Sequence, residues 1–183
     1  MRVIAGTAGR LRIEAPKSLA RPSTDRLREA LFSILGTRVT DARVLDLFAG
    51  SGALGIEALS RGAQSALFVD SDRLASKAID RNLQHTRLDD RGRILQRDAM
   101  QALKGLRGPF DLVFADPPYF TGGEREVDHG RTLLACESLV ALMAEDGVLV
   151  LETGNREPPT SPLWVCDDSR HYGKSHLHFF TRE

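Results

Sequence analysis

Short apolar runs alternate with segments of helical spacing along most of this chain. Between residues 42 and 152, five apolar runs predict strands at 44–47, 66–69, 94–95, 112–115 and 148–152. Helices are predicted between them, near 53–61, from about residue 72, and over 131–143. Alternation of this kind is typical of a doubly wound α/β fold, with a parallel sheet, right-handed crossovers and helices on both faces.

The two ends of the chain depart from this alternation. Residues 2–5 and 11–13 alternate apolar with basic or small residues around turn material at 6–9, which predicts an N-terminal β-hairpin. A helix should begin after Thr24, a good N-cap residue, and end near residue 36. Beyond a proline-rich stretch, 163–166 and 177–181 predict a final antiparallel pair.

We therefore predict one α/β domain over residues 1–183. Its sheet should be seven-stranded, mostly parallel and Rossmann-like. Residues 1–41 should form a basic N-terminal extension, a hairpin plus a helix, packed on that domain.

The composition favours a soluble globular protein, with 42% hydrophobic and 27% charged residues. No apolar run approaches the ~20 residues that span a bilayer, and the first residues do not resemble a signal peptide. We expect a cytoplasmic monomer without a membrane partner.

Cys136 and Cys166 lack C-x-x-C spacing, which argues against a disulfide framework and a thiolate metal site. No ligand set forms around His171, His176 and His178, so no metal is predicted.

The net charge is zero, but the charges are unevenly distributed. Residues 1–43 hold nine Lys/Arg and four Asp/Glu, a net charge of +5, so the remainder carries −5. A basic segment joined to an acidic remainder indicates an anionic partner held at one end, such as a nucleic acid. A solvated surface remains the alternative.

The stretch Asp116-Pro117-Pro118-Tyr119 follows the apolar run 112–115. It should lie in the crevice at the carboxyl end of a buried strand, where open α/β sheets bind ligands. Asp116 and the Pro117 carbonyl can each accept one N–H of an exocyclic amine, while Tyr119 offers a ring for a base to stack on. The alternative is a turn that merely ends the strand.

A second motif, Gly50-Ser51-Gly52-Ala53-Leu54-Gly55, fits G-x-G-x-x-G between a predicted strand and a predicted helix. Asp70 ends the next strand, twenty residues after Gly50, where it can accept hydrogen bonds from ribose hydroxyls. Asp98, after the third strand, can meet an adenine amine or cap the following helix. The expected cofactor contacts are Asp46, Phe48, Gly50, Ser51, Gly52, Asp70, Ser71, Asp98 and Ala99.

Two cofactors suit such a loop, and Asp46 discriminates between them. A dinucleotide would bring a pyrophosphate to this helix N-terminus, and the carboxylate of Asp46 on the preceding strand would repel it. The same carboxylate favours a cationic ammonium or sulfonium group. We therefore predict S-adenosylmethionine rather than NAD.

The two motifs together resemble the amino-methylating class I S-adenosylmethionine-dependent methyltransferases. The segment Arg21-Pro22-Ser23-Thr24-Asp25-Arg26-Leu27-Arg28-Glu29-Ala30-Leu31-Phe32 resembles the N-terminal signature of the RsmD family, the 16S rRNA (guanine(966)-N(2))-methyltransferases. The late segment Arg170-His171-Tyr172-Gly173-Lys174-Ser175 is similar to the closing turn of that family. The resemblance covers essentially the whole chain, and the N-terminal signature makes it specific for the family.

The resemblance implies methylation of the N2 amine of a guanine in the 16S rRNA of the small ribosomal subunit or its assembly intermediate. The implied catalytic residues are Asp116, Pro117, Pro118 and Tyr119, with RNA contacts from Arg21, Thr24, Arg26, Arg28 and Lys174. The motif itself fits adenine N6 equally well, so methylation of adenine in DNA or RNA stays an alternative. A non-catalytic RNA-binding factor that holds the cofactor only as a ligand is a third.

Overall fold

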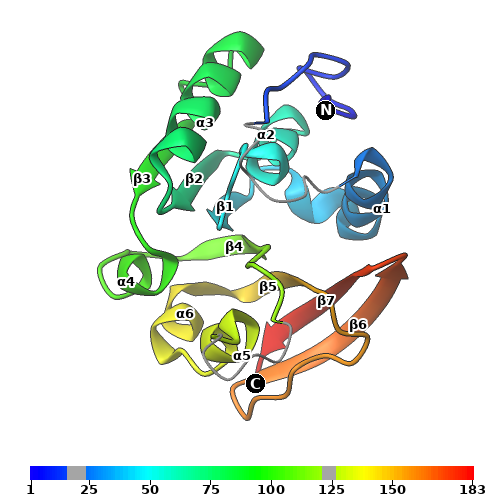
Figure 1. The fold of residues 1–183 in the computed structure, drawn as a ribbon, viewed down its shortest axis with the longest axis vertical. Helices are drawn as coiled ribbons and strands as arrows, with labels where there is room; N and C mark the ends of the chain where they lie inside the picture. Colours follow the sequence, from blue (N-terminus) through cyan, green and yellow to red (C-terminus); the bar gives the residue numbers. More distant parts are fainter. Residues whose placement is uncertain (16–23, 121–126) are drawn as a thin grey trace.

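The computed structural model describes residues 1–15, 24–120 and 127–183. Its seven-stranded sheet has the order β3-β2-β1-β4-β5-β7-β6 (Figure 1). Only β7 runs antiparallel to its neighbours in this sheet. The strands are β1 (Arg43–Leu47), β2 (Ser65–Asp70), β3 (Gly92–Gln96), β4 (Phe110–Ala115), β5 (Met143–Thr153), β6 (Trp164–Tyr172) and β7 (Ser175–Arg182). The predicted fold class, strand count and final antiparallel pair are confirmed.

Helices cover both faces of the sheet, as doubly wound topology requires (Figure 1). One face packs against α1 (Asp25–Leu35), the short 3₁₀ helix η1 (Gly36–Val39), α2 (Ala53–Ser60) and α3 (Arg73–Thr86). The other face packs against α4 (Ala99–Leu103), α5 (His129–Leu134) and α6 (Glu137–Leu142). Because the central strands are buried on both faces, they read as continuous apolar runs in the sequence. In the described part of the chain, no helix is long and apolar enough to cross a membrane.

Two local predictions are wrong. The single helix expected over residues 131–143 is two short helices, α5 and α6, separated at Ala135 and Cys136. Leu133 and Leu139 still enter the same core, so the apolar spacing continues across the break and conceals it. The N-terminal segment doubles back, and backbone hydrogen bonds join its two arms, as from the Val3 N–H to the Leu11 oxygen at 2.9 Å, but it forms one isolated antiparallel bridge, between Arg2 and Arg12, instead of two regular strands.

Buried polar side chains of α2 hold the N-terminal segment against the domain, in addition to the backbone hydrogen bonds between its own two arms. The carboxylate of Glu57, which is fully buried, accepts hydrogen bonds from the backbone N–H of Ile4 at 2.7 Å and of Ala5 at 3.0 Å. At Ser60, the hydroxyl accepts from the Ala8 N–H at 2.9 Å. These bonds satisfy the backbone N–H groups of Ile4, Ala5 and Ala8 and fix the segment on α2.

Gly6 is required by this docking. Its φ of +81° is in the left-handed region, and a Cβ there would lie 1.8 Å from the backbone oxygen of Ser60. Backbone cannot yield as a flexible side chain can, so any larger residue must lift the turn off α2.

We predict that Gly6→Ala lowers the free energy of unfolding by about 2–4 kcal/mol, because it adds a backbone collision to the conformational strain. Gly173→Ala is the matched control: Gly173 has φ +66° and open space around the added Cβ. That variant should cost about 1 kcal/mol, the strain of the left-handed conformation alone. Urea unfolding followed by circular dichroism measures both, and equal losses would contradict the docking account.

Candidate active site at the carboxyl edge of the sheet

The glycine loop joins β1 to α2 and is anchored by Asp46. The Gly55 N–H, in the first turn of α2, donates to Asp46 Oδ2 at 2.9 Å. A Cβ on Gly55 would lie 2.3 Å from Cε1 of Phe68, so only glycine lets α2 pack this closely on the sheet. The loop thus presents its backbone at the carboxyl edge of β1, as predicted.

Asp70 lies at the end of β2 and also binds the glycine loop. Its Oδ2 accepts from the Gly50 N–H and its Oδ1 accepts from the Asp72 N–H, both at 2.8 Å. Each carboxylate oxygen retains a second lone pair for a ligand hydroxyl. Ser71, the next predicted contact, is exposed beside it.

The remaining predicted cofactor residues differ in their surroundings. Phe48 has φ +58°, and the centroid of its ring lies 5.6 Å from that of the His129 ring of α5. Asp98 Oδ1 accepts from the Gln101 N–H at 3.0 Å, so this carboxylate caps α4, as the alternative interpretation expected. Ala99 is buried in the core of that face.

Asp116 follows β4, between the two strands that carry the nearest carboxylates. Ala115 pairs in register with Leu151 of β5, so Asp116 and Glu152 come one residue later on adjacent parallel strands. Asp46 of β1 lies two residues before Asp116 in the same register, which places it on the same face of the sheet. Three acidic side chains from neighbouring strands therefore converge at one edge.

Their proximity and burial shift the protonation of two of them. Burial, reinforced by the charge of Asp70, raises the pKa of Asp46 to about 8, although the hydrogen bond from Gly55 opposes the shift. Burial, followed by the charges of Glu152 and Asp46, raises the pKa of Asp116 well above its usual range. A site with this surplus of acidic groups favours a cation and disfavours a pyrophosphate.

Tyr119 is held rigidly rather than left free. Its hydroxyl donates to Glu152 Oε1 at 2.7 Å and lies 2.8 Å from Ser175 Oγ in the β6–β7 hairpin. Its ring covers Gly154, where a Cβ would lie 2.9 Å from Tyr119 Cδ2. The late hairpin therefore braces the Asp-Pro-Pro-Tyr loop.

A cavity of about 370 Å³ opens beside this loop, between the loop, α5 and the segment that follows β5. Pro117, Pro118, Tyr119 and Glu152 line one side of it. Asn155 and Arg131 lie among the polar residues of its other walls. A cavity of this size accommodates a planar base beside the predicted amine acceptors.

Sequence reasoning missed two polar residues at this site. Glu152 is 5% exposed and is the last residue but one of β5; the signal was an acidic residue closing an apolar run at the same edge as Asp46 and Asp116. Asn82 of α3 accepts from the Glu14 N–H at 2.8 Å and donates to the carbonyl oxygens of Glu14 and Ser51, each at 2.9 Å. It joins the N-terminal segment to the glycine loop, and no sequence motif marks it.

The predicted RNA-binding residues separate into buried and exposed groups. Arg28 is fully buried: its guanidinium donates to Asp25 Oδ1 at 2.9 Å and to the Arg2 carbonyl oxygen. This prediction is corrected, because a side chain packed inside the protein does not reach an RNA phosphate on its surface. Thr24 caps α1 through a 3.2 Å hydrogen bond from the Leu27 N–H. Arg26 and Lys174 are exposed, and Arg21 lies outside the described residues.

Metal chemistry has no site in the described parts of the chain, which contain no cluster of three His, Cys, Asp or Glu able to hold an ion. Cys136 and Cys166 are both free thiols.

Comparisons with known proteins agree with this arrangement. The family model described as Conserved hypothetical protein 95 matches residues 1–181. Ribosomal RNA small subunit methyltransferase D of Escherichia coli (strain K12) is 38% identical over 151 residues, covering 79% of this chain and 75% of that protein. A solved structure of a hypothetical protein from Thermus thermophilus is 31% identical, with a TM-score of 0.80 and coverage of 98% of both chains.

One more distant solved structure shows the same fold with a ligand. SMU.776, complexed with SAH, is 15% identical, with a TM-score of 0.68, and covers 85% of this chain and 49% of that chain. At this identity the similarity concerns the fold alone. The family match and the Escherichia coli relative are decisive, and the chain belongs to the Conserved hypothetical protein 95 family, the RsmD family of ribosomal RNA methyltransferases.

Proposed function

We propose that this protein methylates the exocyclic N2 amine of a specific guanine in the 16S rRNA of the small ribosomal subunit, with S-adenosylmethionine as the methyl donor. One observation carries the proposal: the Asp-Pro-Pro-Tyr loop and the glycine loop end adjacent strands, β4 and β1, at one edge of the sheet. The Escherichia coli relative, whose alignment covers 79% of this chain, is named as a small subunit rRNA methyltransferase.

The residues at the edge fit the cofactor. Bound S-adenosylmethionine supplies an electrophilic methyl group on a positively charged sulfur. The raised pKa of Asp46 indicates that this buried carboxylate lacks a cationic partner strong enough to keep it ionised, a role that a sulfonium or ammonium group fills. The Gly50–Gly52 backbone and the free lone pairs of Asp70 would hold the remaining polar groups of the ligand.

Asp116 and the Pro117 carbonyl would hold the guanine amine. The lone pair of guanine N2 is delocalised into the ring, and accepting both N–H bonds aims it out of the ring plane. The nitrogen must lose a proton as its new bond to carbon forms, and Asp116 takes it. A carboxylate with a raised pKa suits this role better than an ordinary surface aspartate. Pro118 and the braced Tyr119 ring would position the base.

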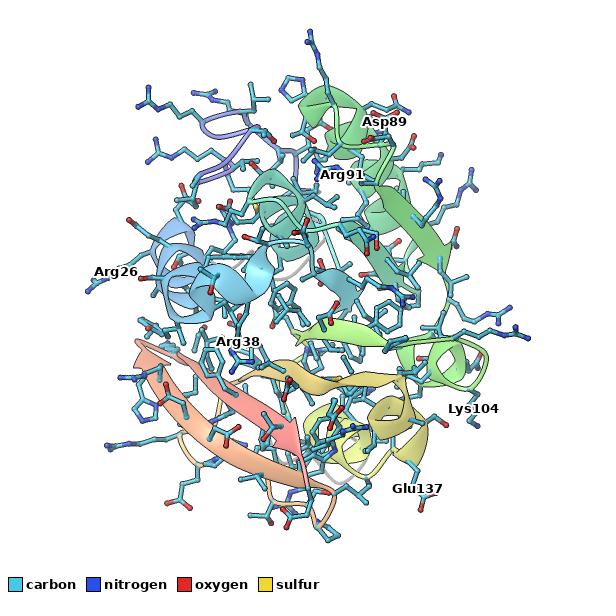
Figure 2. The ribbon with its side chains drawn as sticks, turned by 180° about the vertical axis from the view of Figure 1, so that it is seen from behind. Arg26, Arg38, Asp89, Arg91, Lys104 and Glu137 are labelled. Carbon is cyan, nitrogen blue, oxygen red and sulfur yellow. The ribbon has the colours of Figure 1, made fainter. Side chains whose placement is uncertain are left out.

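The first turn of α1 lies near this edge and supplies an RNA contact. Met1 Sδ lies 3.3 Å from Arg28 Nη1 and 3.8 Å from Ser51 Oγ, so it joins that turn to the glycine loop. Arg26, in the same turn, points away from α1 into solvent (Figure 2). We assign Arg26 and Lys174 to phosphate contacts and leave Arg28 out of the interface.

The direct experiment is transfer of a labelled methyl group from S-adenosylmethionine to small subunits prepared from a methylation-deficient strain. We expect incorporation into 16S rRNA. Cofactor binding without any transfer, to either free RNA or assembled subunits, would support the non-catalytic alternative.

Asp116→Ala should reduce methyl transfer by at least about 10³-fold while S-adenosylmethionine still binds, since both the amine acceptor and the proton acceptor are lost. Asp116→Asn keeps one acceptor oxygen and should retain activity within about 100-fold of the wild type. Asp89→Ala, an exposed acidic residue beyond α3, is the control and should leave the rate unchanged (Figure 2). Full activity of Asp116→Ala would refute the mechanism.

Cofactor binding should release protons. In the free protein Asp46 is mostly protonated below pH 8, and a bound cation lowers its pKa, so affinity should rise from pH 6 towards pH 8 and then level off. Calorimetry in buffers of different ionisation enthalpy measures the protons released. Asp46→Asn should release fewer protons at the same pH. Since the titration of the ligand itself is common to both proteins, equal release would contradict this role of Asp46.

Arg26→Glu should raise the KM for small subunits roughly fivefold or more, with kcat little changed, because it loses a phosphate contact away from the reacting atoms. Arg38→Glu is the matched control. Arg38, also labelled in Figure 2, is exposed as well, but it lies on η1, just before β1, and therefore at the amino edge of the sheet, where it donates to the Asp146 oxygen at 3.2 Å. Steady-state kinetics at two salt concentrations would show the difference, and equal effects of the two reversals would argue against an interface at α1.

A further inference from the structure

The side chain of Glu152 has a buried carboxylate oxygen to which the mechanism above gives no role. The residue is only 5% exposed, and its Oε1 accepts the hydroxyl proton of Tyr119 at 2.7 Å. Its second oxygen, Oε2, is shielded from solvent and has no hydrogen-bond partner within the described segments of the chain. A buried acceptor without a partner costs free energy, so a site that retains one is suited to receive a donor from a ligand.

The position of Glu152 indicates which ligand that is. Glu152 lines the cavity of about 370 Å³ together with Pro117 and Tyr119, two residues of the loop assigned to the target base. It lies near the end of β5, on the strand next to Asp116, and after burial its charge is the main cause of the raised pKa of that residue. Any base whose amine is held by Asp116 and the Pro117 carbonyl therefore presents the neighbouring atoms of its edge close to Glu152.

Those neighbouring atoms differ between the two candidate bases. In guanine one of the two ring nitrogens beside the N2 amine is N1, which carries a hydrogen and donates. In adenine the N1 beside the N6 amine has no hydrogen and accepts. An ionised carboxylate only accepts, so it pairs with guanine N1–H and repels the lone pair of adenine N1.

We propose that Glu152 accepts the N1–H of the target guanine through Oε2 and thereby selects guanine over adenine at this site. This inference rests on the proposed guanine-N2 methylation and adds a specificity-determining residue to it. Guanine is preferred because adenine in the same position would place its N1 lone pair opposite the Glu152 carboxylate. Two hydrogen-bond acceptors would then face each other in a site without water.

Glu152→Gln separates base selection from support of the loop. The glutamine amide keeps an oxygen that accepts the Tyr119 hydroxyl and replaces Oε2 with an N–H₂ donor. The variant therefore retains the brace and reverses the hydrogen-bonding character of the position that faces the base.

The experiment compares small subunits reconstituted with guanine or 2-aminopurine at the target position of the 16S rRNA. 2-Aminopurine keeps the reactive N2 amine but lacks N1–H. We expect wild-type protein to prefer guanine by about 100-fold or more in kcat/KM. Glu152→Gln should lose at least about 50-fold on guanine and discriminate between the two bases by no more than about threefold. Calorimetry with S-adenosylmethionine should give the same affinity for both proteins, which shows that the variant is folded.

Tyr119→Phe is the second variant, because it removes the hydroxyl brace and keeps the carboxylate. It should slow transfer yet retain the preference for guanine. An unchanged preference in Glu152→Gln would overturn the inference, as would the same loss of preference in Tyr119→Phe, which would assign Glu152 to supporting the loop. Either result can be interpreted only if the wild-type protein methylates guanine. If the wild-type protein transfers no methyl group to guanine, the proposed function itself is refuted.

Discussion

Burial of several carboxylates at one edge of the sheet is the constraint on which this site depends. Asp46, Asp116 and Glu152 lie at the carboxyl ends of adjacent parallel strands, and Asp70 adds its charge from the next strand. Removal from water is the largest cause of the raised pKa values of Asp46 and Asp116, and repulsion between carboxylates adds to it. In the proposed mechanism, a cationic cofactor relieves this repulsion, and its binding thereby prepares Asp116 to accept the amine.

The periphery of the fold keeps these groups in place. On one side, Asn82 and the N-terminal segment hold the glycine loop, while Glu57 and Ser60 hold that segment against α2. On the other side, the β6–β7 hairpin reaches back through Ser175 to the Tyr119 hydroxyl. The antiparallel pair at the end of the chain thus supports the Asp-Pro-Pro-Tyr loop, and the N-terminal segment supports the glycine loop.

The places of Asp46, Asp70 and Asp116 could be predicted from the sequence. Each lies near or just after the end of an apolar run, so the run places the residue at the carboxyl edge of the sheet, and the surrounding motif indicates its chemistry. Glu152 lies near the end of β5 without a motif around it, and only the register of β4 and β5 shows that it lies beside Asp116. Arg28 was assigned to RNA because charge alone does not reveal its contacts with Asp25 and the Arg2 carbonyl. The break between α5 and α6 escaped notice because both helices bury the same apolar stripe.

The identity of the methylated nucleoside tests the central claim most directly. Small subunits from a methylation-deficient strain would be incubated with the protein and labelled S-adenosylmethionine, and the 16S rRNA digested and analysed by mass spectrometry. The arrangement of Asp116, Pro117 and Glu152 predicts N2-methylguanosine as the single labelled product. N6-methyladenosine would contradict the account, because the same edge would then have to receive a base whose N1 accepts rather than donates.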